Sequence, residues 1–270
     1  MSKIMDSLHN IRLLDDLGKQ DTFIHRLHPL TKLLTTVIYL TVVVSFDRYA
    51  VGPLLSFVFY PVFVLAWAEL PLLAILKSIL LVEPLILTIG ILNPLFDHNT
   101  ILVGKTVISM GWITFLSIVI KGSITVTVGV LLLATTGIEK LATALRIIKI
   151  PQIFVLQLLL TYRYISVLIE EVYRMIRAYL LRAPGQKGIQ RSMWGSFAGL
   201  LLLRTYDRAQ LVYQAMNLRG FTGEYHSGDI AKVGFYDIVF LLIWSVFFIM
   251  ARIYNIPMLI GLFCQGVFGQ

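Results

Sequence analysis

The chain has 270 residues, of which 57% are hydrophobic and 14% are charged, and it carries a formal net charge of +8. This composition is far more apolar than that of soluble domains, so it excludes a water-soluble enzyme or binding module and indicates an integral membrane protein. Cys264 is the only cysteine, which excludes an intrachain disulfide and a cysteine-based zinc site.

Long apolar runs predict an all-α fold, because a helix in lipid satisfies its own backbone hydrogen bonds and the runs lack the short alternation of a β-barrel. The segment 1–32 mixes acids and bases and has no apolar core of a cleavable signal peptide, so we expect the first span to be retained. About 17 to 25 apolar residues cross a bilayer. We predict five spans, at 33–46, 49–68, 72–92 (ended by Asn93-Pro94), 109–136 and 234–251. A sixth at 253–270 is left open, because Asn255, Pro257 and three glycines interrupt it.

The segment 137–232 differs from the spans in its charge. It holds 13 of the chain's 23 lysines and arginines but 6 of its 15 acids. Basic residues gather on the cytoplasmic side of membrane proteins, and four spans return a chain that begins inside to the inside. We predict four parts in a multi-pass protein of the inner membrane: a cytosolic N-terminal segment (1–32), four spans (33–136), a cytosolic insert (137–232), and a last span with its tail (233–270).

The insert carries helix signals throughout, and a structureless loop of this length is improbable. Thr136 and Glu139 have the spacing of a capping box, which predicts a short amphipathic helix that ends at Pro151. Two long helices, at about 152–181 and 190–218, are separated by a turn at 183–188. Both begin apolar and end charged, so we expect a crossed pair at the membrane face. Gly195 and Gly199 form a GxxxG pattern that permits close helix crossing.

Matching segments end the two long helices. In each, an alanine lies four residues before an arginine on the same helix face, and a glycine able to end the helix in the left-handed conformation follows. The residues are Ala178, Arg182, Ala183 and Gly185 in the first segment, and Ala215, Arg219 and Gly220 in the second. The arginine fork binds carboxylates or carbonyls at any physiological pH. We interpret the segments as two docking tips; the alternative is that each arginine only complements its helix dipole.

Further blocks follow one another along the chain. They are 25–33 (HRLHPLTKL), Thr135-Thr136, 141–145, Pro151, 159–164 (LLTYRY) with Glu170-Glu171, and the two arginine segments. This ordered set covers most of the chain and resembles a known family, the transmembrane T component of energy-coupling factor (ECF) transporters of the cobalt and nickel (CbiQ-like) type.

The resemblance implies a scaffold without catalytic activity that joins two cytosolic ABC-type ATPases to a separate membrane subunit, which binds the substrate. It implies that Arg182 and Arg219 cap coupling helices that dock in grooves of the ATPases. It also implies that ATP and magnesium are bound by the ATPases and that this chain holds no cofactor or metal. Ala183-Pro184 stands before Gly185 where the family has Arg-Gly, which leaves the shape of the first tip open.

Glu83 and Lys121 lie within predicted spans, where charge is costly and often functional. An ion relay is one interpretation of these residues. We favour a structural role over it, either a Lys121–Glu83 pair or polar contacts that hold helices together. A stand-alone secondary transporter that uses these two residues is the alternative from another functional class. An intramembrane enzyme is a third, although the polar residues are scattered.

His25 and His28, with His9 as a third candidate, could bind a metal, but their position at a membrane entry favours hydrogen bonding. The basic excess follows membrane topology, so we expect anionic lipid and acidic protein grooves as partners, and no nucleic acid. The sequence therefore predicts the coupling subunit of an importer for cobalt or nickel, with a vitamin importer as the alternative.

Overall fold

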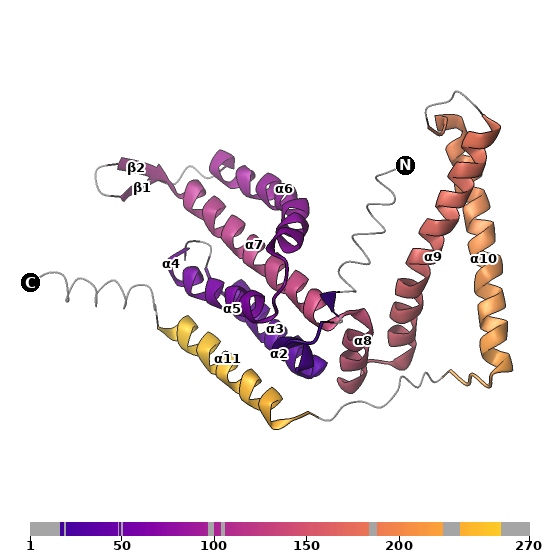
Figure 1. Cartoon of the computed structure of the whole chain (residues 1–270). Coiled ribbons are helices and arrows are strands. Elements are labelled where there is room, and N and C mark those ends of the chain that lie inside the picture. The colour runs from indigo at the N-terminus through magenta and orange to yellow at the C-terminus, as the bar shows by residue number, and fades with distance from the viewer. Residues whose placement is uncertain are drawn as a thin grey trace, which may run out of the picture. The chain divides into compact units, whose positions relative to one another are not determined.

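The computed structural model describes residues 17–18, 20–47, 49, 51–96, 100–103, 106–183, 188–223 and 233–254. The chain forms two compact units. The span unit comprises Asp15–Leu141 and Ala231–Gln270, and the insert unit comprises Met1–Leu14 and Ala142–Ile230. Figure 1 shows that both are built mainly of helices.

The span unit contains most of the apolar helices. Its elements are α2 (Phe23–Arg26), α3 (Pro29–Val44), α4 (Val51–Leu54), the 3-10 helix η1 (Leu55–Val58), α5 (Phe59–Trp67), α6 (Leu72–Phe96), strands β1 (Thr100–Val103) and β2 (Thr106–Ser109), α7 (Met110–Thr136) and α11 (Phe235–Ile253). Then α8 (Ile138–Ile147) leads from α7 into the insert unit, which contains α9 (Gln152–Arg182), η2 (Arg191–Met193) and α10 (Trp194–Leu218). The prediction of an all-α membrane protein is confirmed, with a short antiparallel hairpin of β1 and β2 added between α6 and α7.

By length and composition alone, four helices among the described residues can cross a membrane: Ile75–Phe96, Met110–Thr136, Gln152–Arg182 and Phe235–Ile253. Pro29–Val44 and Val51–Trp67 are shorter apolar helical segments. The third of the four is α9, which the sequence predicts to lie in the cytosolic insert, so that placement stays a prediction. The open sixth span at 253–270 falls almost wholly outside the described residues.

Two proline-containing segments differ from prediction for a shared physical reason. We expect α6 to end at Asn93-Pro94, but it continues to Phe96. Pro94 cannot donate to the carbonyl of Gly90, and the side-chain amide of Asn93 donates to that oxygen instead, at 3.2 Å. Pro61 likewise leaves the carbonyl of Phe57 without its helical donor. The Tyr39 hydroxyl donates to it at 2.9 Å, where the predicted second span is interrupted by η1.

A third difference concerns the start of α8. Thr136 is the last residue of α7, and its hydroxyl has no hydrogen-bond partner among the described residues, so the predicted capping box with Glu139 does not form through it. Gly137 makes the junction with a φ of 71°. Its N–H donates to Leu133 O at 2.9 Å and its carbonyl accepts from Leu141 N at 3.1 Å. One left-handed residue therefore ends α7 and begins α8.

Glycines let α6 and α7 approach closely as an antiparallel pair. A Cβ at Gly111 would lie 2.6 Å from the Cα of Pro94, and one at Gly122 would lie 2.8 Å from the side chain of Ile86. Small residues permit this packing of backbones within a membrane. The close approach holds together the two longest helices of the span unit.

Charged groups hold α3 at both of its ends. At its start, Asp237 of α11 accepts from the N–H of His28 at 2.7 Å, and Lys32 donates to the carbonyl of Thr135 in α7 at 2.8 Å. At its other end, Lys121 of α7 donates to Phe46 O at 2.6 Å and Arg252 of α11 donates to Ser45 O at 3.2 Å. Thus α11 runs parallel to α3 and α7 antiparallel. Asp237 lies at the positive end of the α3 dipole, where Lys32 is bound by the Thr135 carbonyl, and the cations Lys121 and Arg252 lie at its negative end.

Candidate functional site

The insert unit presents α9 and α10 as an antiparallel pair (Figure 1). The side chains that join the helices include three described pairs. Tyr179 packs edge-on against Phe197 with ring centroids 5.5 Å apart. The guanidinium of Arg204 binds the carboxylate of Glu171, and that of Arg208 lies 5.7 Å from the ring centroid of Tyr164. As the residue numbers fall along α9 they rise along α10, which fixes the antiparallel direction.

Glu171 is the polar centre of this pair. Its side chain is 17% exposed, and it binds Arg204 of α10 and, at 3.0 Å, Arg174 of its own helix. Polar and aromatic contacts therefore join α9 to α10, and the apolar first halves of both helices keep exposed side chains such as Phe154 and Leu202. These apolar halves lie at opposite ends of the pair, because the helices are antiparallel.

The predicted docking tips also lie at opposite ends. Arg182 ends α9 near the start of α10, whereas Arg219 follows the last residue of α10. The 25 residues of α10 correspond to about 38 Å of helix at 1.5 Å per residue, so the tips are separated by roughly that distance. Two partner surfaces of protein size can therefore be reached at once.

The second tip has the helix end that the sequence predicts. Gly220 has a φ of 80°, the Phe221 N–H donates to Met216 O at 3.0 Å, and the Gly220 N–H donates to Asn217 O at 2.9 Å. This is a Schellman ending, in which a left-handed glycine lets the chain satisfy the last carbonyls. Arg219 is therefore fixed at a well-defined helix end.

The first tip ends differently. Ala183 is the C-cap residue with φ −123° and ψ 67°, and its N–H donates to Tyr179 O at 3.0 Å. Gly185 lies outside the described residues, so its predicted role stays a prediction. Arg182 itself is the last residue of α9, at the helix end that the sequence predicts for it.

Both tips point exposed groups into solvent. Ala178, Arg182, Ala215 and Arg219 are all exposed. Within the described part of the chain, neither guanidinium has an ion-pair or hydrogen-bond partner. Among the described residues, neither arginine therefore makes the local contact with acids or carbonyls that is usual in the last turn of a helix.

Sequence reasoning missed the leucine that precedes each arginine. Leu181 is 76% exposed and Leu218 is 90% exposed, which are high values for apolar side chains beside a charged residue. The shared pattern is therefore Ala-x-x-Leu-Arg in both helices. The repeat in the sequence contains this signal, but the exposure of the two leucines depends on the folded pair and cannot be seen in the sequence.

A groove of about 540 Å³ lies between α9 and α10. Apolar side chains and the Glu171–Arg204 contact line it, and it reaches Ala215, one turn before Arg219. The two tips thus differ in helix ending, and the second tip has this groove one turn away.

Gly195 and Gly199 do not bring the two helices together. A Cβ at either glycine would meet no atom within 4 Å, so the predicted close crossing at this pattern is wrong within the pair. The helices are joined instead by larger polar and aromatic groups from other positions. Packing of these glycines against another chain stays a prediction.

Glu83 and Lys121 do not pair. Glu83 accepts from the hydroxyl of Ser123, at 3.0 Å to one carboxylate oxygen. Lys121 donates to Phe46 O at 2.6 Å and to Asp47 O at 3.1 Å. Each residue therefore makes its own polar contact between helical segments, in place of a Lys121–Glu83 pair.

The histidines before α3 make hydrogen bonds. His28 is the N-cap of α3, and its Nδ1 accepts from Leu30 N at 3.1 Å. His25 Nδ1 lies 2.7 Å from the hydroxyl of Thr22, and its Nε2 makes no hydrogen bond of good geometry to a described residue. Burial lowers the pKa of His25, the charge of Lys32 lowers it further, and the Ala134 backbone acts in the opposite direction.

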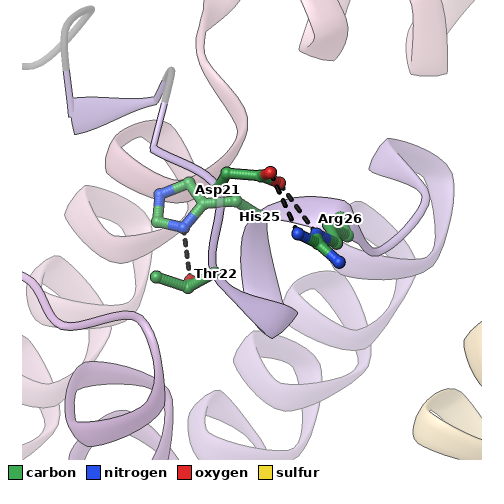
Figure 2. Close-up of polar contacts among 4 residues, drawn as sticks. All are labelled: Asp21, Thr22, His25 and Arg26. Atoms are coloured by element: carbon green, nitrogen blue, oxygen red, sulfur yellow. Dashed lines mark hydrogen bonds and ion pairs between the residues drawn. The ribbon is translucent and has the colours of Figure 1, made fainter.

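Figure 2 shows His25 beside an exposed ion pair. Arg26 donates to both carboxylate oxygens of Asp21, at 2.8 and 3.0 Å. These bonds lower the pKa of the Asp21 carboxyl. Among the described residues, no three histidine, cysteine, aspartate or glutamate side chains gather as a metal site.

Comparison with known proteins agrees with this architecture. Residues 20–229 match the model of the CbiQ family, described as a cobalt transport protein. The chain is also 27% identical over 187 residues to an uncharacterized protein of Methanocaldococcus jannaschii, a match that covers 65% of this chain and 64% of that protein. The chain thus spans somewhat less than two thirds of that relative. The family match includes α3, α7 and both arginine tips, and the chain belongs to the CbiQ cobalt transport protein family.

Proposed function

We propose that this chain is the transmembrane coupling subunit of an ATP-driven ECF-type importer, with cobalt or nickel as the substrate. It joins two cytosolic ABC-type ATPases to a separate membrane subunit that binds the substrate. ATP and magnesium are bound by the ATPases, and this chain is a non-catalytic, multi-pass subunit of the inner membrane with 1–32 and 137–232 in the cytosol.

The observation that carries the proposal is the pair of matching arginine tips at opposite ends of α9 and α10. Arg182 and Arg219 are exposed, stay charged at any physiological pH, and lack partners among the described residues. Arginine is enriched among the residues that contribute most to protein interfaces. Two like tips about 38 Å apart suit two like partners, such as the paired ATPases of an ABC-type motor.

The antiparallel arrangement suits coupling to a membrane subunit. Exposed apolar side chains lie on the first half of each helix, for example Phe154 on α9 and Leu202 on α10. Each end of the pair therefore combines an apolar helix start with an arginine tip. A pair that lies along the membrane face can contact membrane-embedded neighbours through the former and cytosolic partners through the latter.

The separate bonding of Lys121 and Glu83 weakens the alternative of a stand-alone secondary transporter. Lys121 binds carbonyls at the end of α3 and Glu83 binds Ser123, so each already has a structural role. That alternative predicts substrate uptake by the purified chain alone, driven by an ion gradient.

The test is reconstitution of the chain with its ATPases and its substrate-binding subunit in proteoliposomes. We expect Arg182→Glu or Arg219→Glu to lower ATPase co-purification and ATP-dependent uptake of Co²⁺ or Ni²⁺, while membrane insertion is kept. Arg177→Glu, an exposed arginine on α9 with the same charge change, is the matched control. Undiminished ATPase content and uptake in both tip variants would contradict the proposal. Uptake of a vitamin in place of the metals would correct the substrate alone.

A further inference from the structure

The structure supports one inference about the tips beyond the role of their arginines. We propose that Leu181 and Leu218 are the apolar anchors of the two tips, and that each partner groove holds a leucine-sized apolar pocket beside its arginine acceptors. This inference rests on the proposed function, because the ATPases are the partners in question.

Exposure is the first argument. Leu218 is 90% exposed and Leu181 is 76% exposed, although both belong to the charged halves of their helices. Exposed leucines on the spans face lipid, which accounts for them. With 137–232 in the cytosol, as the proposed function has it, an apolar side chain this exposed beside a charged group is typical of an interaction site.

Repetition is the second argument. Both leucines stand directly before the arginine and three residues after the alanine, in helices that otherwise share little sequence there. Residues three apart lie on neighbouring parts of one helix face, so the small Ala178 or Ala215 leaves room around the leucine. A partner wall can then close over the leucine while the adjacent arginine reaches acceptors at the pocket rim.

Helix geometry is the third argument, and it favours a protein partner over lipid. At the second tip the Schellman ending fixes Leu218 and Arg219 relative to each other, with Gly220 at a φ of 80°. Lipid headgroups require no such fixed spacing, and one leucine contributes little to membrane binding. A protein groove with a fixed pocket and fixed carboxylates or carbonyls gains from the preorganised pair.

The experiment measures binding of the full chain in nanodiscs to its purified ATPase subunits. We expect Leu218→Ala and Leu181→Ala each to weaken binding at least about tenfold, because the lost side chain no longer fills its pocket. Leu218→Met should restore most of the affinity, since methionine has nearly the volume of leucine. Asn217→Ala, an exposed neighbour outside the repeated pattern, is the matched control and should bind as the wild type does.

A photo-crosslinking residue at position 218 identifies what covers the leucine. Crosslinks to apolar residues of an ATPase beside acids or carbonyls support the inference, and crosslinks to lipid alone overturn it. Wild-type affinity of both leucine-to-alanine variants also overturns it. If the wild-type chain binds no ATPase at all, the proposed function fails; if Arg219→Glu abolishes binding while Leu218→Ala is silent, the leucine anchor alone fails.

Discussion

Asp237, in the first turn of α11, accepts a hydrogen bond of 2.7 Å from the backbone N–H of His28, which lies 209 residues earlier in the chain. Its second oxygen accepts from the N–H of Gly234, also at 2.7 Å. Through these two hydrogen bonds the buried carboxylate caps the start of α3 and the start of α11 together. One acid therefore fixes the relative height of two apolar helices.

We expect Asp237→Ala to destabilise the span unit by about 1 to 3 kcal/mol, because it leaves two backbone donors without an acceptor. The measurement is the thermal midpoint of the purified protein in detergent. Asp21→Ala is the control, since Asp21 forms only an exposed pair with Arg26 and should change the midpoint little. Equal midpoints for wild type and Asp237→Ala would show that the cap is dispensable.

Lys121 and Glu83 should act independently. They bind different partners, so the destabilisation of Lys121→Met combined with Glu83→Gln should equal the sum of the single effects to within about 0.5 kcal/mol. A double-mutant cycle on unfolding in detergent measures this sum. A large coupling energy would contradict this result, because it would indicate that Lys121 and Glu83 interact directly as an ion pair.

A second double-mutant cycle, which serves as the comparison for the first, combines Lys121→Met with Arg252→Met. Both cations serve the end of α3, where Arg252 donates to Ser45 O and lies 4.4 Å from the ring centroid of Phe46, whose carbonyl binds Lys121. Because the two share this helix end, we expect their effects to be non-additive. Additive effects in this pair would argue against joint capping of α3.

The glycines between α6 and α7 should tolerate a methyl group unequally. At Gly111 a Cβ meets the backbone of Pro94 at 2.6 Å, whereas at Gly122 it meets the movable side chain of Ile86 at 2.8 Å. We expect Gly111→Ala to cost more than Gly122→Ala, with each on the order of 1 to 3 kcal/mol. Gly129→Ala is the control, since its Cβ meets nothing within 4 Å. Thermal midpoints rank the three, and a reversed order would contradict the packing.

His25 should make stability fall on acidification. Burial lowers its pKa, so the folded protein holds the neutral ring more strongly than the unfolded chain does. The contribution is therefore complete above the unfolded pKa of about 6.5 and is lost as pH falls through the lower folded value. Thermal midpoints between about pH 7.5 and 5 should fall less steeply in His25→Gln than in the wild type. Identical slopes would exclude His25 as the group responsible.

The long helices were predictable because their signals are local. The apolar runs of α7 and α11, and the breaks around α9, need no distant partner to be recognised. The end of α6 was not predicted, because Asn93 replaces the donor that Pro94 lacks and its amide can equally face water. The interruption at η1 precedes Pro61, which frees the carbonyl of Phe57, but the donor that satisfies this carbonyl is Tyr39 of another helix, which no pattern within 49–68 reveals.

The candidate site shows the same division. The arginines and alanines of the tips could be found as a repeat in the sequence, and the family match confirms the resemblance drawn from it. The distance between the two tips could not be predicted from the sequence, because it depends on the antiparallel pairing of α9 and α10 through Glu171 and Arg204. The partners of Lys121 are backbone carbonyls, which every residue has, so no pattern of side chains identifies them.

The clamp on α3 has a consequence for the order in which the protein is assembled. Of the groups that hold this helix, Lys121 is made about 75 residues after α3, whereas Asp237 and Arg252 are made only after the whole insert has been synthesised. After α3 has been synthesised, the backbone groups at its ends therefore lack part of their hydrogen-bond partners until α11 has been synthesised. Synthesis of α9 and α10 thus precedes completion of the contacts around α3, and a nascent chain halted within 137–232 cannot complete them.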